Sequence, residues 1–267
     1  MATAADTFER KEKKYLITTG QCAAIKAALA SHMRLDDYGV TRIDSLYLDT
    51  PARDLICRSL EKPVYKEKVR IRSYGPLKQG SPVFLELKKK SEGVVYKRRA
   101  TMDPARAAQF LRGEGDPQNQ IERELDFSVR RYGGLVPAAY IAYDREAFYA
   151  SDDHEFRMTF DRRVRYRTED MDLTMGSAGT QILPDGKVLL EVKCAGAMPL
   201  WLVRFLSAEH IYKTSFSKYG TAYQQILARQ LAPRGRHLST LPSYAPAPVR
   251  VPALRRPRFA DAQVAVA

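Results

Sequence analysis

Basic and apolar side chains alternate along two consecutive segments of the chain, residues 65–72 and 84–90. Successive side chains of a β-strand point to opposite faces, so the first segment gathers four cations on one face: Lys66, Lys68, Arg70 and Arg72. The second segment places Glu86, Lys88 and Lys90 on one face. Two such strands side by side predict a basic surface with one embedded carboxylate, which is suited to binding a multivalent anion.

Three further segments repeat this alternation, at residues 93–101, 138–148 and 155–167. For any single strand, the solvated face of an ordinary antiparallel sheet is the simpler explanation. Like charges that face one another across strands repel, so recurrence over several strands favours an anion between them. A lining of this kind suits a polyanion that is bridged by metal ions.

The alternating segments belong to a longer series of predicted elements. Period-two patterns predict strands over eight segments: residues 8–17, 41–48, 65–72, 84–90, 93–101, 137–149, 154–167 and 187–194. Apolar spacing and capping residues, Thr18 or Thr19, Thr50, Asp103 and Ser217 among them, predict helices: residues 20–33, 51–60, 104–112, 118–132, 198–210 and 217–229. We therefore predict an α+β fold, in which about eight long antiparallel strands close around a charged interior and the helices pack outside.

The chain has 267 residues, 45% of them hydrophobic, and a formal net charge of +13. This length can bury one large β-rich core, which we place in residues 1–231. Residues 232–267 are rich in Pro and Arg, lack a periodic apolar pattern, and are predicted to form a disordered tail. The positive charge favours an acidic partner, which could be nucleic acid, an anionic membrane surface or a phosphate-rich molecule.

The sequence lacks the signals that are typical of several functional classes. The three cysteines, Cys22, Cys57 and Cys194, are too widely spaced for a disulfide framework or a zinc site, and they predict reduced thiols in a cytoplasmic protein. The four histidines show no metal-ligand spacing, and no glycine-rich phosphate loop occurs. No stretch reaches the roughly 18 apolar residues of a membrane helix, so we expect no membrane span.

Eight short runs, in order along the chain, resemble one known family. They are Glu9–Tyr15, Ser45–Thr50, Tyr65–Arg72, Phe84–Lys88, Val95–Arg99, Tyr143–Ala147, Leu190–Lys193 and Phe216–Gly220. Together they are similar to the VTC (vacuolar transporter chaperone) domain, one of the triphosphate tunnel metalloenzymes related to the CYTH proteins. The resemblance covers about residues 8–229 and leaves the tail outside.

The resemblance implies an eight-stranded antiparallel β-tunnel that binds phosphate chains. In catalytic members it implies a polyphosphate polymerase, which transfers the γ-phosphoryl group of ATP to a growing polyphosphate and releases ADP. The implied cofactor is a divalent metal, Mn²⁺ or Mg²⁺. Since positioning and charge neutralisation dominate phosphoryl transfer, many cations around a carboxylate-held metal can suffice.

The resemblance also implies roles for residues of this chain. Six cations match catalytic positions: Lys14, Arg70, Arg72, Lys88, Arg145 and Lys218. Five residues match substrate-binding positions: Lys97, Arg99, Tyr143, Arg157 and Ser217. Glu191 matches the metal-binding glutamate, and Glu12 and Glu86 could bind the metal or form ion pairs with the lysines. Two positions before Ser217, where some catalytic members have a lysine, this chain has Ser215, which removes a phosphate contact.

Other functions fit the same residues. Related tunnels hydrolyse triphosphate or short polyphosphate, and a non-catalytic protein could bind polyphosphate or inositol phosphates. RNA binding needs exposed basic and aromatic side chains rather than an enclosed lining, so nucleic acid is not the expected partner. Because no membrane segment is predicted, export of a polymer would need a separate membrane protein.

Overall fold

The structure, a computed structural model, describes residues 11–92, 94–153 and 155–231. The predicted tail and residues 8–10 of the first predicted strand lie outside the described residues. The strands are β1 (Lys11–Thr18), β2 (Met33–Asp49), β3 (Tyr65–Tyr74), β4 (Val83–Ser91), β5 (Val94–Met102), β6 (Val136–Ala150), β7 (Arg157–Arg167), β8 (Thr180–Gln181), β9 (Lys187–Cys194) and β10 (Lys213–Thr214). The helices are α1 (Thr19–Leu29), α2 (Asp54–Leu60), α3 (Pro104–Leu111), α4 (Gln120–Arg131), α5 (Leu200–Ala208) and α6 (Lys218–Leu231).

The described strands form one antiparallel sheet. Its order is β10-β1-β9-β7-β6-β2-β3-β4-β5, and β8 pairs with β7. Eight strands contain between 8 and 17 residues, whereas β8 and β10 contain two residues each. The predicted α+β fold with eight long antiparallel strands is therefore confirmed.

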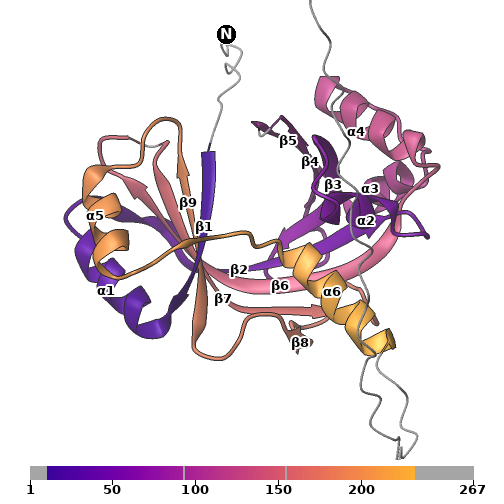
Figure 1. The fold of residues 1–267 in the computed structure, drawn as a ribbon. Coiled ribbons are helices and arrows are strands. Elements are labelled where there is room, and N and C mark those ends of the chain that lie inside the picture. The colour runs from indigo at the N-terminus through magenta and orange to yellow at the C-terminus, as the bar shows by residue number, and fades with distance from the viewer. Residues whose placement is uncertain (1–10, 93, 154, 232–267) are drawn as a thin grey trace, which may run out of the picture. The chain divides into compact units, whose positions relative to one another are not determined.

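The sheet is tunnel-like, although its backbone pairing does not close within the described part of the chain. Strands β5 and β10 are its edges, and β2 and β6 bend through its middle (Figure 1). Side chains join the two ends of the strand order, because Lys88 of β4 donates from Nζ to Glu12 Oε2 of β1 at 3.3 Å. The charged face is thus concave, and strands from both ends of the sheet border it.

Four helices cover the apolar face of the sheet, as predicted. Helices α1 and α5 cover one part of this face, around Ile25, Phe160 and Leu202. Helices α3 and α4 cover another part of the same face, around Leu85 and Phe110 (Figure 1). Each large apolar side chain buried in this way stabilises the fold by roughly 1.5–3 kcal/mol. None of the described helices is long and apolar enough to cross a bilayer.

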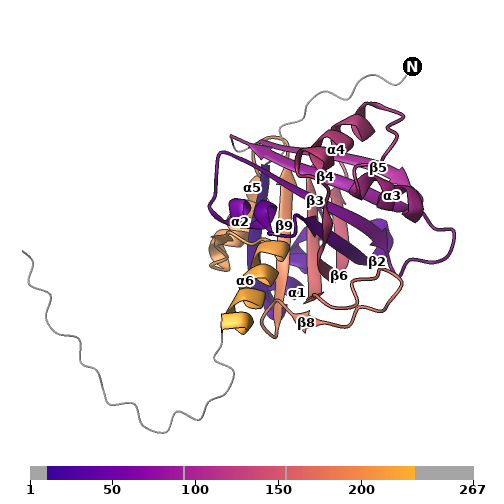
Figure 2. The same cartoon turned by 90° about the vertical axis from the view of Figure 1, so that its right-hand side faces the viewer.

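Helix α6 packs instead against part of the charged face, beside the strands (Figure 2). Tyr219 of α6 stacks on Tyr47 of β2 with ring centroids 4.8 Å apart. The Tyr219 hydroxyl donates to Asp49 Oδ2 at 2.9 Å. The Tyr47 hydroxyl in turn accepts from Arg70 Nη1 at 3.0 Å, which places this ring at the border of the cationic surface. The first residues of α6 are thereby fixed next to that surface.

Some predicted boundaries are wrong. The helix predicted from Pro51 begins at Asp54, because Asp49 accepts hydrogen bonds from the amides of Leu55 and Ile56 at 2.9 and 3.0 Å. Strand β2 is also longer than the predicted 41–48. Its first residues pair with β6 from Met33 onward, so the preceding helix ends before residue 33. Residues 34–40 carry many polar side chains, and the pairing of Arg34, Leu35 and Val40 with β6, which local pattern does not show, extends the strand across them.

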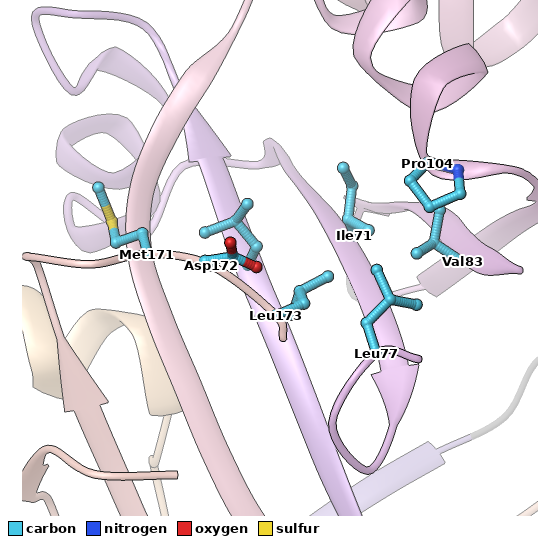
Figure 3. Close-up of a pocket in the computed structure, with 8 residues that line it drawn as sticks. Ile71, Leu77, Val83, Pro104, Met171, Asp172 and Leu173 are labelled. Atoms are coloured by element: carbon cyan, nitrogen blue, oxygen red, sulfur yellow. The ribbon is translucent and has the colours of Figure 1, made fainter. Parts of the chain in front are cut away.

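A pocket of about 310 Å³ lies on the apolar face of the sheet. It is lined by Ile71, Leu77, Val83 and Leu173, and Asp172 is the charged residue among its described lining residues (Figure 3). An apolar lining offers few donors for phosphate oxygens. We therefore place the candidate site on the opposite, charged face.

Candidate functional site

Glu86 of β4 is the centre of a first cluster of opposite charges. Its side chain is only 2% exposed. Arg70 donates from Nε to Oε2 at 2.8 Å, and Arg99 donates from Nε to Oε1 at 2.7 Å. Lys97 Nζ lies 2.8 Å from Oε1, and Arg72 Nη2 lies 3.7 Å from Oε2. An arginine has five N–H donors, so the arginines held here keep donors for phosphate oxygens.

The strand register explains this first cluster. Arg70 of β3 and Arg99 of β5 are the two residues directly opposite Glu86 on its neighbouring strands. Burial opposes ionisation of Glu86, but Arg70, Arg72 and Lys97 outweigh burial and hold the pKa of this carboxyl well below its usual range. Glu86 therefore stays charged and keeps the cations in place.

A second cluster joins β6, β7, β9 and the start of α6. Arg145 donates from Nε and Nη2 to the two oxygens of Asp161 at 2.6 and 2.7 Å, and from Nη2 to Glu191 Oε2 at 3.0 Å. Lys218 Nζ lies 2.5 Å from Asp161 Oδ2 and 2.9 Å from Glu191 Oε1. Asp161 is fully buried, and Glu191 and Lys218 are nearly so. Two desolvated cations are thus fixed by two carboxylates.

Strand β1 connects the two clusters. Lys14 Nζ lies 3.1 Å from Glu12 Oε1 and 3.4 Å from Glu191 Oε1. The other oxygen of Glu12 accepts from Lys88, which lies two residues after Glu86 on the same face of β4. The charged face therefore forms one continuous surface from Glu191 to Glu86.

The pair Glu12 and Glu191 could share a divalent cation. Burial opposes ionisation of both carboxyls, but nearby lysines outweigh it. Lys218 and Lys14 hold the pKa of Glu191 well below its usual range, and Lys88 and Lys14 lower the pKa of Glu12 to about 2. Both groups are ionised at neutral pH. Both also lie close to the Lys14 ammonium, so a position between them already accommodates positive charge.

These two carboxylates fit a metal that binds together with phosphate. In the part of the chain that the structure describes, no group of three or more His, Cys, Asp or Glu residues could hold a metal ion. Mg²⁺, however, usually binds through one or two carboxylates plus water and substrate phosphates. Glu86, also predicted as a metal ligand, lies in the first cluster, where Arg70 and Arg99 donate to its two oxygens. It orients these two arginines.

The segment before α6 adds a hydroxyl and an ammonium to the site. Ser217 Oγ accepts from the Gly220 amide at 3.1 Å and from Lys68 Nζ at 2.7 Å. A Cβ on Gly220 would lie 3.2 Å from the Ser217 side chain, so glycine permits this close turn. The next residue, Lys218, lies over the ring of Tyr143 with Nζ 4.5 Å from the centroid. The helix start thus presents its first residues to the second cluster.

The structure places all the predicted site residues on the charged face, with Arg157 at one end of β7. This arginine is the first residue of β7, lies opposite Lys193 of β9, and is exposed. Sequence reasoning omitted three residues of the charged face from the predicted site, namely Asp161, Lys68 and Lys193. The alternation already placed Asp161 and Lys68 on that face. Their partners could not be foreseen, because they depend on which residues the strands and α6 bring opposite one another.

Comparison with known protein families gives one match for this chain. The model of the VTC domain matches residues 9–227 of the chain. A search of curated proteins found no significant match.

Solved structures resemble the fold. A protein from Hippeastrum, assigned as an adenylyl cyclase and described as having a dominant triphosphatase activity, matches with a TM-score of 0.51 and 18% identity, over 80% of this chain and 95% of that chain. A protein assigned as an adenylate cyclase from Bacillus halodurans has a TM-score of 0.49 and 13% identity, over 78% of this chain and 95% of that chain. At such low identity the likeness concerns the fold alone.

Proposed function

Because the chain belongs to the VTC domain family, we propose that it is a polyphosphate polymerase. It transfers the γ-phosphoryl group of ATP to the end of a polyphosphate chain. The bond between the γ-phosphorus and the oxygen that bridges to the β-phosphate breaks, and ADP leaves with that oxygen. A new P–O bond forms with a terminal oxygen of the chain. The observation that supports this proposal most is the row of buried and half-buried cations around a few carboxylates on one concave face.

The two clusters suit different parts of this reaction. Arg70, Arg72 and Arg99 would bind phosphate groups beside Glu86. Arg145 and Lys218 would bind the phosphate that is transferred, because both contact Glu191, one of the proposed metal ligands, and charge interactions are strong where water is largely excluded.

Lys14 lies between the carboxylates that would hold Mn²⁺ or Mg²⁺. The bound metal would neutralise charge on the phosphate oxygens. The protein itself then has to position the reactants and provide positive charge, and it needs no strong nucleophile of its own.

A direct assay tests the proposed function. Purified protein is incubated with ATP and Mn²⁺, the products are resolved on a gel stained for polyphosphate, and ADP and orthophosphate are quantified. We expect a ladder of chains with a matching amount of ADP, and we expect chelation of the metal with EDTA to abolish both. Intact ATP under every metal and primer condition would overturn the proposal.

Hydrolysis of triphosphate is a second candidate, favoured by the activity described for the Hippeastrum protein of similar fold. The same cations would hold the substrate, and water would attack the terminal phosphorus in place of a chain. Such an enzyme would release orthophosphate and build no polymer, so the same product analysis separates the two reactions.

Lys68 should make phosphate binding depend on pH. Its Nζ donates to Ser217 Oγ. Burial lowers the pKa of Lys68 to about 7, and four neighbouring cations act in the same direction: Lys14, Lys88, Lys66 and Arg70. A phosphate beside Nζ favours the ammonium form and raises this pKa, so binding takes up a proton above about pH 7. The affinity for phosphate should therefore fall as the pH rises from about 7 towards the raised pKa.

Titration calorimetry with tripolyphosphate measures this proton uptake. At about pH 8, two buffers with different ionisation enthalpies should give different binding enthalpies, and Lys68→Met should reduce this difference; the remainder would come from other lysines of the charged face, such as Lys97, whose pKa burial also lowers to about 7. The matched control is Lys89→Met, which removes a lysine from the opposite face of β4 and should leave the uptake unchanged. If Lys68→Met takes up as much proton as the wild type, Lys68 does not titrate on binding.

A further inference from the structure

Two aromatic side chains lie where the charged face reaches the β3–β4 turn. Tyr74 is the last residue of β3, and Phe84 lies near the start of β4. Both share the face of Arg72, because Phe84 lies directly opposite Arg72 and Tyr74 follows Arg72 by two residues. Their rings meet edge to face, with centroids 5.4 Å apart. We call these two residues the aromatic pair.

Tyr74 differs from the other tyrosines of this face in its exposure. Tyr47 and Tyr143 are 7% and 3% exposed. The ring of Tyr47 is covered by Tyr219, and the ring of Tyr143 lies beneath Lys218. Tyr74, in contrast, is 49% exposed. Among the described residues, its one ring partner is Phe84, which is not stacked on it. Tyr74 can therefore still stack with a planar group of a ligand.

Arg99 joins the aromatic pair to the first cluster. It donates from Nε to Glu86 Oε1 at 2.7 Å and from Nη2 to the Tyr74 hydroxyl at 3.2 Å. Its guanidinium carbon also lies 4.8 Å from the centre of the Phe84 ring. A carboxylate and two rings thus fix one arginine between a phosphate-binding cluster and an aromatic surface. A ligand with phosphates at one end and a flat ring at the other would contact both.

The spacing along β3 fits a nucleotide. Tyr74 lies two residues from Arg72, about 7 Å along an extended strand. In a nucleotide one ribose separates the base from the first phosphate, which is a distance of the same order. A base beside Tyr74 would therefore place the first phosphates beside Arg72 and Arg99, and the remaining phosphate would extend along the charged face, away from the turn.

We propose that the aromatic pair is a nucleobase site, in which the base of ATP stacks on the exposed ring of Tyr74. This inference rests on the proposed function and adds a site for the part of ATP that is not phosphate. Stacking on an aromatic ring tolerates every base, since each base has a π-face. The site should therefore accept GTP as well as ATP, and tripolyphosphate, which has no base, should not use it.

The test is titration calorimetry of ATP, GTP and tripolyphosphate in EDTA, with wild-type protein and three variants. Tyr74→Leu removes the ring, and we expect it to weaken binding of both nucleotides by about tenfold, a change of about 1.4 kcal/mol. Its affinity for tripolyphosphate should stay within about twofold of the wild-type value, which also shows that the charged face is intact. Tyr74→Phe keeps the ring and should bind all three probes within about twofold of the wild type.

Phe127→Leu is the matched control, because Phe127 is 65% exposed but lies on α4, away from the charged face. It should bind every probe as the wild type does. The proposal is wrong if Tyr74→Leu weakens tripolyphosphate as much as ATP, or if GTP keeps its full affinity for this variant. It is also wrong if Tyr74→Phe loses as much affinity as Tyr74→Leu, since the hydroxyl and not the ring would then be responsible. Absence of ATP binding by the wild type would overturn it as well.

These outcomes are distinct from those that test the proposed function. If wild-type protein makes polymer while Tyr74→Leu binds ATP normally, the nucleobase site fails and the polymerase stands. If wild-type protein makes no polymer but Tyr74→Leu shows the selective loss of nucleotide affinity, the polymerase fails and the nucleobase site stands.

Discussion

Glu191→Gln is expected to lower metal-dependent turnover by on the order of 10²–10³-fold while phosphate-chain binding persists. The substitution keeps the size of the side chain but removes a charge that lies beside Lys218, Arg145 and Lys14. The metal loses a ligand, whereas Arg145 and Lys218 keep their ion pairs with Asp161 and stay available to phosphate. Binding of polyphosphate should therefore be as tight as in the wild type, or tighter.

Turnover of ATP with Mn²⁺ and binding of tripolyphosphate with EDTA measure the two halves of this prediction. The matched control is Glu122→Gln, because Glu122 is also buried and paired with an arginine, Arg106 at 2.6 Å, but lies on α4 away from the charged face. The control should keep its turnover per folded molecule. Equal turnover by Glu191→Gln and the wild type would remove Glu191 from the mechanism.

Asp161→Asn is expected to cost about 3–5 kcal/mol of stability, because it removes one partner from a fully buried group of ion pairs. The amide of Asn would direct N–H groups at Arg145 or Lys218, which themselves can only donate. Both cations should then move from their positions, so turnover should also fall, by about tenfold or more. Denaturant unfolding gives the change in free energy, and assays well below the unfolding midpoint give the turnover of folded protein.

Glu114→Gln provides the control for Asp161→Asn. Glu114 pairs with Arg112 at 2.7 Å, but both side chains are more than half exposed, and exposed pairs contribute about 0–1 kcal/mol. Unfolding of this variant should be close to that of the wild type. A loss of stability no larger in Asp161→Asn than in Glu114→Gln would show that the buried group does not hold the fold together.

The amino-acid sequence predicts those site residues and helix caps whose roles follow from the pattern of neighbouring residues in the chain. Alternation with a period of two placed Arg70, Arg72 and Glu86 on one face, and the register then brought them together. The predicted caps Thr18 and Asp103 also hold, since each side chain accepts a hydrogen bond from the first turn of its helix.

Asp161 shows what local pattern cannot predict. Next to Arg162 and Arg163 in the sequence, it is indistinguishable from an aspartate on a solvated strand. Its burial follows from Arg145 lying directly opposite on β6 and from Lys218 arriving from the far end of the chain. Lys68 is similar, because its contact with Ser217 joins residues 149 positions apart. Such roles become visible only once the strands and α6 are packed.

The change from arginine to lysine along β3 has a mechanical consequence. A chain that grows at one end must slide past its binding groups by one unit after each addition. Arginines that are held rigidly by Glu86 resist such sliding, because their paired donors fit phosphate oxygens in one geometry. Lysines on flexible stems can pass from one phosphate to the next with little loss of energy. The strand would thus bind the polymer firmly near the reacting end, where the arginines lie, and more loosely along the lysines. An enzyme built in this way would keep a long polymer bound and still let it advance by one phosphate after each addition.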